Sequence, residues 1–219
     1  MAMKAAAFND RIRDHLYPYF EHKHYELEDG RLVFRRKTSF GHSEIIINVI
    51  KGDVDAAVDF HLGLRHDLVE IAMSGLFGQR DYYLRESATL LTDLRLLTKL
   101  PSEQSVRRPV VSSLDETEAL CDCFIDFMDR KGFAFLAKYA KLASLGHLFN
   151  DKTRLSAEYC NHSYQRCFRG MTIAEILGRA DLAALREKHR SYLLSRGYAG
   201  NVIHKFDTNF ARTGQISLN

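Results

Sequence analysis

Residues that interrupt regular structure are scarce in this chain of 219 residues, which has 3 prolines and 13 glycines. Disordered and collagen-like chains are rich in these residues, so both classes are excluded. Apolar residues make up 46% of the sequence and charged residues 27%, which is typical of globular domains. A chain of this length buries a full core without metal or disulfide staples. We therefore expect one globular domain that spans residues 1–219.

Long apolar runs are also missing, since no segment approaches the roughly 18–20 consecutive apolar residues that span a bilayer. The N-terminal segment MAMKAAAF runs at once into Asn9, Asp10 and Arg11, unlike a signal peptide. Both absences predict a cytoplasmic protein without a membrane span. In this reducing compartment the four cysteines are expected to be free thiols, packed as small core residues: Cys121, Cys123, Cys160 and Cys167.

The motifs that identify common enzyme classes are absent as well. The sequence contains no Gly-x-Ser-x-Gly, no glycine-rich phosphate loop followed by Lys-Ser or Lys-Thr, no dinucleotide-binding fingerprint and no His-Glu-x-x-His. We therefore predict no cofactor, assign no catalytic residue and favour a protein that is not an enzyme. An enzyme of unknown class stays open as an alternative, with its site on the sheet face around His61 and Arg65.

The first half of the chain favours a helix that is followed by a hairpin. Residues 3–20 carry apolar side chains at helical spacing: Phe8, Ile12, Leu16 and Tyr19. After this helix we expect a sheet-rich part over residues 20–111. It begins with Asp29-Gly30 between two short extended runs, which is a hairpin signal.

Two further runs predict the middle of an antiparallel meander. Residues 45–50 are apolar on both faces apart from Asn48, which predicts a central strand with Ile46 and Ile47 largely buried. Residues 58–65 alternate between apolar and polar side chains, which predicts a half-buried strand. The other predictions for this part are a helix over 67–77 that ends before Gly78, a strand rather than a helix within 84–98, and an edge strand over 109–111.

The second half, residues 113–197, favours a group of helices. A capping box formed by Ser113 and Glu116 opens a helix to Arg130, and Gly132 is expected to break it. Two further helices are predicted over 133–149 and over 155–168, and the second is expected to stop at Gly170. A second capping box at Thr172 opens a short helix to Gly178, and a last helix runs from Asp181 to Arg196 with Gly197 as its C′ residue. The tail over residues 200–219 is expected to be loose. Strands followed by helices predict an α+β fold: an N-terminal helix, an antiparallel meander sheet, and a C-terminal group of helices packed on it.

Two groups of histidine and cysteine residues are candidate metal ligands. His22 and His24 would share a face on a strand but not on a helix, and a solvated surface pair is the preferred interpretation. A zinc site built from Cys160, His162, Cys167 and the Cys121 region is the other candidate, and core packing of these cysteines is preferred over it. We therefore predict that protein purified without added metal contains no stoichiometric zinc or iron.

The clearest functional pattern is an acidic stripe on the helix that covers residues 114–130, formed by Asp115, Glu118, Asp122, Asp126 and Asp129. At 100° per residue, these carboxylates fall within an arc of about 80°. Like charges at this spacing repel each other, so a stripe without interleaved lysine predicts a docking face for a basic protein partner. The alternative is the solvated face of an ordinary amphipathic helix. Three or more of the five carboxylates paired with Lys or Arg of the same chain would make the stripe structural.

Positive charge gathers in the C-terminal part of the chain. Residues 152–212 contain 11 Lys and Arg against 5 Asp and Glu, whereas the net charge of the whole chain is +3. Basic residues interleaved with Tyr192 and Tyr198 could bind single-stranded nucleic acid: Arg179, Arg186, Lys188, Arg190 and Arg196. The preferred interpretation is that these helices complement the acidic helix within the same fold, because a pI near 8.6 is low for a nucleic-acid domain.

Three segments carry a resemblance to known proteins: Glu28 to Phe34, Ile45 to Ile50, and Thr172 to Leu182. In pattern, over two thirds of the chain, the layout resembles small bacterial α+β proteins of unknown function, of the immunity-protein type found in polymorphic toxin systems. This resemblance implies a cytoplasmic protein that is not an enzyme and binds a partner protein, and it carries over no functional residue. Partner binding through the acidic stripe is thus the first functional interpretation, ahead of an enzyme and of weak nucleic-acid binding.

Overall fold

The computed structural model describes residues 5–52, 55–78, 86–98, 106, 109–152, 156, 159 and 163–211. It confirms the α+β fold class, with an N-terminal helix, an antiparallel sheet and then helices. The chain forms two compact units, each built from two stretches of sequence. Unit 1 comprises residues 1–65 and 90–138, and unit 2 comprises residues 66–89 and 139–219. The single domain over residues 1–219 stays a prediction.

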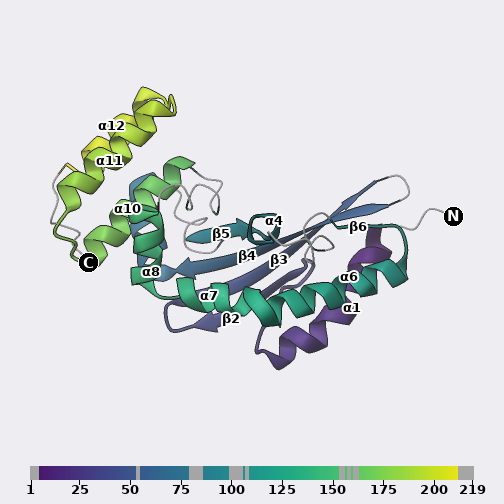
Figure 1. Cartoon of the computed structure of the whole chain (residues 1–219). Coiled ribbons are helices and arrows are strands. Elements are labelled where there is room, and N and C mark those ends of the chain that lie inside the picture. Colours follow the sequence, from purple (N-terminus) through teal and green to yellow (C-terminus); the bar gives the residue numbers. More distant parts are fainter. Residues whose placement is uncertain are drawn as a thin grey trace. The chain divides into compact units, whose positions relative to one another are not determined.

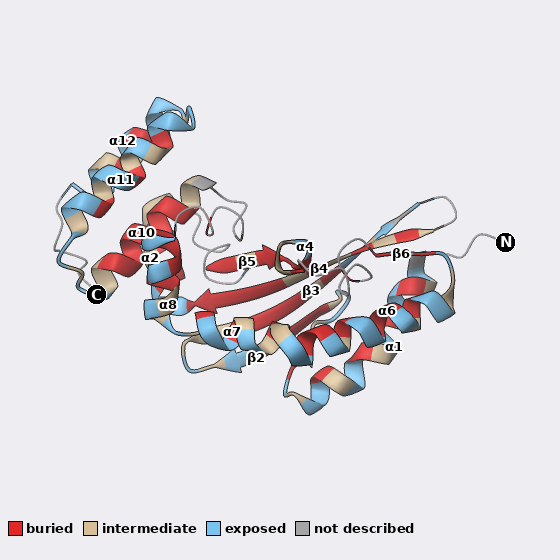
Figure 2. Cartoon of the chain, viewed as in Figure 1, coloured by how far each residue is buried: buried red, intermediate tan, exposed pale blue. Residues whose placement is uncertain are grey.

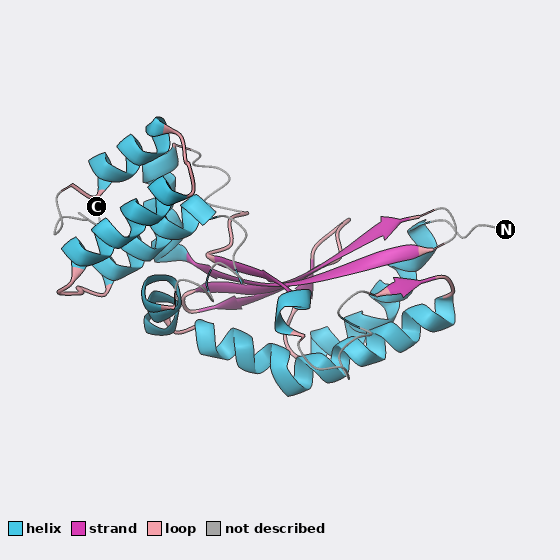
Figure 3. Cartoon of the chain, turned by 45° about the horizontal axis from the view of Figure 1, so that its top comes forward, coloured by secondary structure: helices cyan, strands magenta, loops and turns pink. Residues whose placement is uncertain are grey.

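The sheet has six strands: β1 (Glu26–Leu27), β2 (Val33–Thr38), β3 (Gly41–Lys51), β4 (Ala56–His66), β5 (Leu90–Asp93) and β6 (Val110–Val111). The first five follow the order β1-β2-β3-β4-β5, and β6 pairs with β4, which confirms the predicted meander and the edge strand. Gly30 has a φ of 72°, the left-handed conformation that the predicted hairpin turn requires. Figure 3 shows the strands together in one sheet.

Two helices, α1 (Ala5–His22) and α6 (Leu114–Phe127), lie side by side along one face of this sheet (Figure 1). Phe124 of α6 stacks on Phe60 of β4 with ring centroids 4.0 Å apart, and Phe20 of α1 lies 4.7 Å from the ring of Phe34 in β2. Figure 2 shows the buried sides of both helices turned toward the sheet and their exposed sides turned outward. Tyr19, predicted for the buried side of α1, is only partly buried, and Phe20 is in the core instead.

Strand β3 lies in the middle of the sheet, as its apolar run predicts. Ile47 is 4% exposed, which confirms its predicted burial, whereas Ile46 is intermediate and Ile50 is 56% exposed. Successive residues of a strand point to opposite faces, and the helices α1 and α6 cover only the face to which Ile45 and Ile47 belong. The apolar run over residues 45–50 therefore predicts burial on both faces of the strand, whereas only the face covered by the helices is fully buried.

Gly132 does not break the helix that begins at Leu114, so this prediction is wrong. Helix α6 continues through the π-helical turn η2 (Met128–Gly132) into α7 (Phe133–Tyr139), and Figure 1 shows the ribbons of α6 and α7 following one another. A Cβ atom at position 132 would lie 2.3 Å from Sδ of Met128. Glycine at this position leaves room for a buried side chain and does not end the helix.

Residues 84–98, for which a strand is predicted, contain both kinds of structure. Strand β5 is followed directly by the short helix α4 (Leu94–Leu97), and residues 84 and 85 lie outside the described residues. The side chain of Asp93 accepts a hydrogen bond from the backbone N–H of Arg95 at 2.8 Å. This N-cap converts the end of the strand into the start of a helix.

Unit 2 is helical, with α2 (Asp67–Phe77), α8 (Leu142–Gly146), the π-helical turn η3 (His147–Asp151), α10 (Ser163–Ile176), α11 (Leu182–Ser195) and α12 (Gly200–Asn209). Its aromatic core centres on Phe168, whose ring lies 4.9 Å from Phe77 and 5.2 Å from Phe206. The predicted helix ends at Gly78 and Gly197 are confirmed, and both glycines have a positive φ, of 66° and 69°. In the part of the chain that the structure describes, no helix is both long and apolar enough to cross a membrane.

Several helix boundaries predicted for unit 2 are wrong. Gly170 does not stop a helix and Thr172 does not open one, because both lie inside α10. The predicted helix over 133–149 is divided at Lys141, which has an extended backbone. The tail from residue 200 is not loose up to residue 209, since α12 buries Ile203 and Phe206 there. The predicted start at 155 and the last residues, 212–219, lie outside the described residues.

Candidate partner-binding surface

The helix that carries the acidic stripe is held at its start by the predicted capping box. The Ser113 hydroxyl accepts a hydrogen bond from the backbone N–H of Glu116 at 3.1 Å. The Glu116 carboxylate accepts bonds from the backbone N–H and the hydroxyl of Ser112, at 2.6 and 2.8 Å. Both bonds lower the pKa of Glu116 below its usual value, and the bond from the Ser112 backbone has the larger effect. The first turn of α6 therefore carries two carboxyl groups, Asp115 and Glu116, and the hydrogen bonds from Ser112 favour the ionised form of Glu116.

Most carboxylates of the acidic stripe are paired within unit 1. Asp122 lies 2.7 Å from Nε2 of His15, and Asp115 is the one member without a partner among the described residues. The other three pair with Arg or Lys, as Glu118–Arg11 at 3.0 Å, Asp129–Lys23 at 3.4 Å and Asp126–Arg130. Three of the five carboxylates are therefore paired with Lys or Arg of the same chain, which is the number that makes the stripe a structural feature of unit 1. We do not carry the docking prediction forward for the whole stripe.

The partners that the structure shows for the stripe are Arg11 and His15 of α1, Lys23 directly after α1, and Arg130 of η2. Tyr19 of α1 also donates a hydrogen bond to Asp129 at 2.7 Å. Cations on the neighbouring helix offset the repulsion between carboxylates three and four residues apart. Each of these exposed pairs contributes no more than about 1 kcal/mol to stability.

A groove separates α6 from strand β6 and has a volume of about 290 Å³. The residues that line it are Pro109, Val110 and Val111 of the strand segment and Glu116, Ala119, Leu120 and Cys123 of the helix. The four helix residues are spaced at i, i+3, i+4 and i+7, so they share one side of α6. Val110 is 60% exposed, and Ala119 and Cys123 are exposed as well. The groove is therefore an apolar strip open to solvent, with the acidic first turn of α6 at one end.

Strand β6 leaves part of its backbone without a partner among the described strands. It pairs with β4 in the register Ala56↔Val111 and Ala57↔Val110, and Val58 donates its N–H to the carbonyl of Pro109 at 3.0 Å. In an antiparallel ladder, successive residues direct their N–H and C=O groups alternately toward the partner strand and away from it. The N–H and C=O of Val110 therefore point away from β4. A free edge of this kind is a template for a further strand.

The alternative site around His61 and Arg65 lies on the other face of the sheet. His61 is the cross-strand neighbour of Asp93, and Arg95 donates from Nε to the Asp93 carboxylate at 2.7 Å. Burial alone would raise the pKa of Asp93, but the hydrogen bonds from Arg95 outweigh it and hold the pKa below its usual value. Arg65 is buried. A histidine and a carboxylate thus meet here, with the carboxylate charge already matched by Arg95.

Glu44 is a second carboxylate on this face that sequence reasoning missed. It is buried over Gly63, where a Cβ atom would lie 2.5 Å from Cγ of Glu44. Arg35 and His42 approach its carboxylate at 3.0 and 3.5 Å. Burial acts to raise the pKa of Glu44, and His42 and Arg35 together lower it below its usual value. A lone glycine inside an apolar strand pattern, as at Gly63, is the sequence signal for such a close approach.

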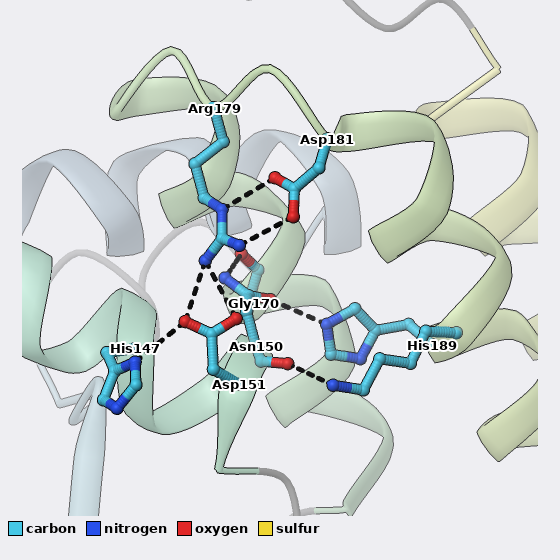
Figure 4. A network of polar contacts seen from close by, with 8 residues as sticks. His147, Asn150, Asp151, Gly170, Arg179, Asp181 and His189 are labelled. Carbon is cyan, nitrogen blue, oxygen red and sulfur yellow. Dashed lines mark hydrogen bonds and ion pairs between the residues drawn. The ribbon is translucent and has the colours of Figure 1, made fainter.

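Unit 2 contains a network of polar side chains around η3 (Figure 4). The buried Asn150 donates from Nδ2 to the carbonyl of Gly170 at 2.9 Å, and its Oδ1 lies 2.8 Å from Nε2 of His189. Because this oxygen is an acceptor, His189 carries its proton on Nε2. Burial, reinforced by the charges of Arg166 and Lys188, lowers the pKa of His189 to about 3. The ring is therefore neutral at physiological pH and serves as a hydrogen-bond donor.

An exposed set of ion pairs adjoins this network. Arg179 donates to Asp181 at 2.8 and 2.7 Å and to Asp151 at 3.1 Å, and His147 lies 2.8 Å from Asp151 (Figure 4). The other basic residues predicted for nucleic-acid binding are also engaged in part, with Arg186 and Arg190 on Asp207 and Lys188 on the carbonyl of Asn150. Three of the five basic residues therefore form ion pairs within unit 2, and only part of the positive charge that motivated that alternative is matched there.

A buried ion pair in unit 2 was not foreseen from the sequence. Arg169 of α10 donates to both carboxylate oxygens of Glu70 in α2, at 2.8 and 2.9 Å. Burial acts to raise the pKa of Glu70, but Arg169, Ser87 and Thr89 outweigh it and hold the pKa below its usual value. A fully hydrogen-bonded pair of this kind joins the two helices, and removal of either partner would leave a buried charge.

The candidate metal ligands lie apart from these groups. His22 ends α1 and His24 follows it with a φ of 63°, and both are exposed, which confirms the interpretation as surface histidines. Cys121 and Cys167 are buried as predicted, whereas Cys123 is exposed in the groove. Cys160 and His162 fall outside the described residues, so the zinc alternative is untested. Within the described ranges, no three His, Cys, Asp or Glu side chains converge as a metal site.

Comparison of the chain with models of protein families, with curated proteins and with solved structures finds no match. The resemblance to bacterial proteins of the immunity type therefore stays a prediction that depends on sequence pattern. Any function assigned to the chain depends on the geometry of its own residues.

Proposed function

We propose that this chain binds a partner protein through the groove between α6 and β6 in unit 1. The observation that carries the proposal is the combination of an exposed apolar strip with carboxylates that pair with no cation among the described residues. Ala119 and Cys123 are exposed on the side of α6 that lines the groove, and apolar side chains exposed beside a polar rim are typical of interaction surfaces. The proposal keeps the expected partner binding and moves the contact from the acidic stripe to the neighbouring side of the same helix.

The lining of the groove favours a protein partner over a small molecule. A small-molecule site has several polar groups that converge on the ligand. In this groove the polar group of the lining is the Glu116 carboxylate, and it already accepts hydrogen bonds from Ser112. The remaining lining is mostly aliphatic, which suits apolar side chains presented by another protein.

Charge at the end of the groove favours a basic partner. Asp115 and Glu116 are both exposed, and no Lys or Arg in the described part of the chain pairs with either of them. The start of a helix carries about half a positive elementary charge, which offsets only part of two carboxylates. A basic partner would therefore associate faster at low ionic strength, and the gain would fade as salt is raised.

The test uses Ala119→Arg, which fills the exposed groove with a long cationic side chain. Ala137→Arg is the matched control, because residue 137 is also an exposed alanine on a helix of unit 1 and does not line the groove. We expect the tagged wild-type chain and the control to retain the same partner protein from an extract of the source cells, and Ala119→Arg to lose it. Equal retention by both variants, or no partner retained by the wild type, would contradict the proposal.

A further inference from the structure

Building on the proposed function, we infer that the groove takes an extended segment of the partner, which adds to β6 as a further strand. The segment carries an apolar side chain over Ala119 and Leu120 and a Lys or Arg beside Asp115 and Glu116. This inference specifies the chemistry of the partner: an extended chain in which a basic and an apolar residue are two positions apart.

The backbone of Val110 supplies the reason for an extended segment. Its N–H and C=O both point away from β4, so a residue placed opposite can exchange two hydrogen bonds with it. Addition of a strand to a free sheet edge gains affinity from such main-chain bonds and specificity from alternate side chains. A partner helix has no free backbone groups along its length and would leave those of Val110 unused.

The alternation of side chains decides which residues of the segment enter the groove. The residue opposite Val110 points to the same face of the sheet as Val110 itself. Its two neighbours in the segment point to the other face, where Val111 is buried against the helix side and the groove opens. Every second residue of the segment therefore faces α6.

The spacing along α6 matches this alternation. Glu116 and Leu120 both line the groove and are four residues apart, which is a rise of about 6 Å in a helix. Residues two apart in an extended segment are about 6.6 Å apart. One groove-facing residue can therefore lie over the apolar part while the next one reaches the acidic end. A cation there meets two carboxylates without competing cations among the described residues.

The probe for this inference is an acetylated and amidated peptide with the sequence Thr-Lys-Thr-Val-Thr-Lys-Thr. Its symmetry places a Lys two positions from Val in either strand direction. We expect weak binding of the labelled peptide by fluorescence anisotropy, and at least a tenfold loss when Glu replaces both Lys residues. Methylation of the backbone nitrogens of the two Thr that flank Val should abolish binding. Methylation of the Val nitrogen, which points to solvent, should leave binding within about twofold.

Substitution of the protein gives a second measurement. Val110→Pro removes the free N–H, and Val110→Thr is its control with the N–H retained; because this N–H is not bonded to β4, both variants should keep their thermal stability. We expect Val110→Pro to bind the peptide at least tenfold more weakly than Val110→Thr. If Val110→Pro is unstable, the two methylated peptides decide the question with the wild-type chain.

The outcomes separate this inference from the proposed function. Equal binding of both methylated peptides, or no binding of the Lys peptide while Ala119→Arg still abolishes partner retention, would overturn the extended segment and leave the proposed function standing. Peptide binding that Ala119→Arg does not weaken would place the peptide elsewhere and overturn the inference as well. Absence of both peptide binding and partner retention would overturn both.

Discussion

Gly132 and Gly170 both lie inside helices, and their surroundings differ in kind. A Cβ atom at position 170 would lie 2.8 Å from Oδ1 of Asn150 and 3.0 Å from Nε2 of His189, two atoms that bond to each other. At position 132 the same atom would meet only the flexible end of Met128. One glycine thus protects a buried hydrogen bond, whereas the other makes room for a side chain that can move.

We therefore predict that Gly170→Ala lowers the free energy of unfolding by about 2–3 kcal/mol, because a buried bond is displaced or broken. Gly132→Ala should change it by less than about 1 kcal/mol, since the better helix propensity of alanine offsets the movement of Met128. Urea unfolding of both variants measures the difference. Equal losses at the two positions would show that the contact with Asn150 and His189 is not what requires glycine.

His24 offers a gain in stability. It follows α1 with a φ of 63°, its N–H bonds to the carbonyl of Glu21 at 2.9 Å, and that of Tyr25 bonds to the carbonyl of Phe20 at 2.9 Å. This is the helix-ending motif in which glycine is usual, because a Cβ atom disfavours the left-handed conformation. His24→Gly should raise the unfolding free energy by about 0.5–1 kcal/mol. His22→Gly, inside the helix, should lower it, and a gain in both variants would refute the argument.

At the scale of elements, β3 gives a test of how the sheet is covered. Ile47 faces α1 and α6 and is 4% exposed, whereas Ile50 in the same strand is 56% exposed. Ile47→Ala should cost about 2–5 kcal/mol of unfolding free energy, since it leaves a cavity in the middle of the sheet. Ile50→Ala should cost less than about 0.5 kcal/mol. A loss below about 0.5 kcal/mol at Ile47 would mean that the strand is not central to stability.

At the scale of the whole molecule, the buried histidines of unit 2 predict a loss of stability in acid. The folded chain holds the pKa of His189 at about 3, and burial also lowers that of His66, whereas an unfolded histidine titrates near 6.5. The unfolded state therefore binds more protons than the folded state below about pH 6.5. The contribution of His189 is fully present above that pH and falls by up to about 1.4 kcal/mol per pH unit below it.

Urea unfolding at pH 7.5 and pH 5 measures this contribution. The wild-type chain should lose stability between the two values, and His189→Gln, which retains an N–H donor toward Asn150, should lose distinctly less. An unchanged loss in His189→Gln would show that other groups control the acid response.

The sequence alone determined the local structure wherever a pattern had its own cause in neighbouring residues. The capping box at Ser113, the hairpin at Gly30 and the helix ends at Gly78 and Gly197 are formed by residues within a few positions of each other. Periodicity likewise placed the strands of the meander, because burial of one face repeats along the chain. The groove was not foreseen, although the edge strand and the helix that form it were both predicted.

Tertiary structure decided what depends on residues far apart. Asp122 and His15 are 107 positions apart, so pairing of the acidic stripe with α1 had no local sequence signal. Gly132 and Gly170 look like helix breakers in the sequence, and only the packed neighbours Met128, Asn150 and His189 show what a side chain at each position would meet. Local sequence patterns reflect the conformational preferences of the backbone, so they predict turns, caps and helix ends. Charge pairing and close packing depend on which elements the fold brings together, so local patterns do not predict them.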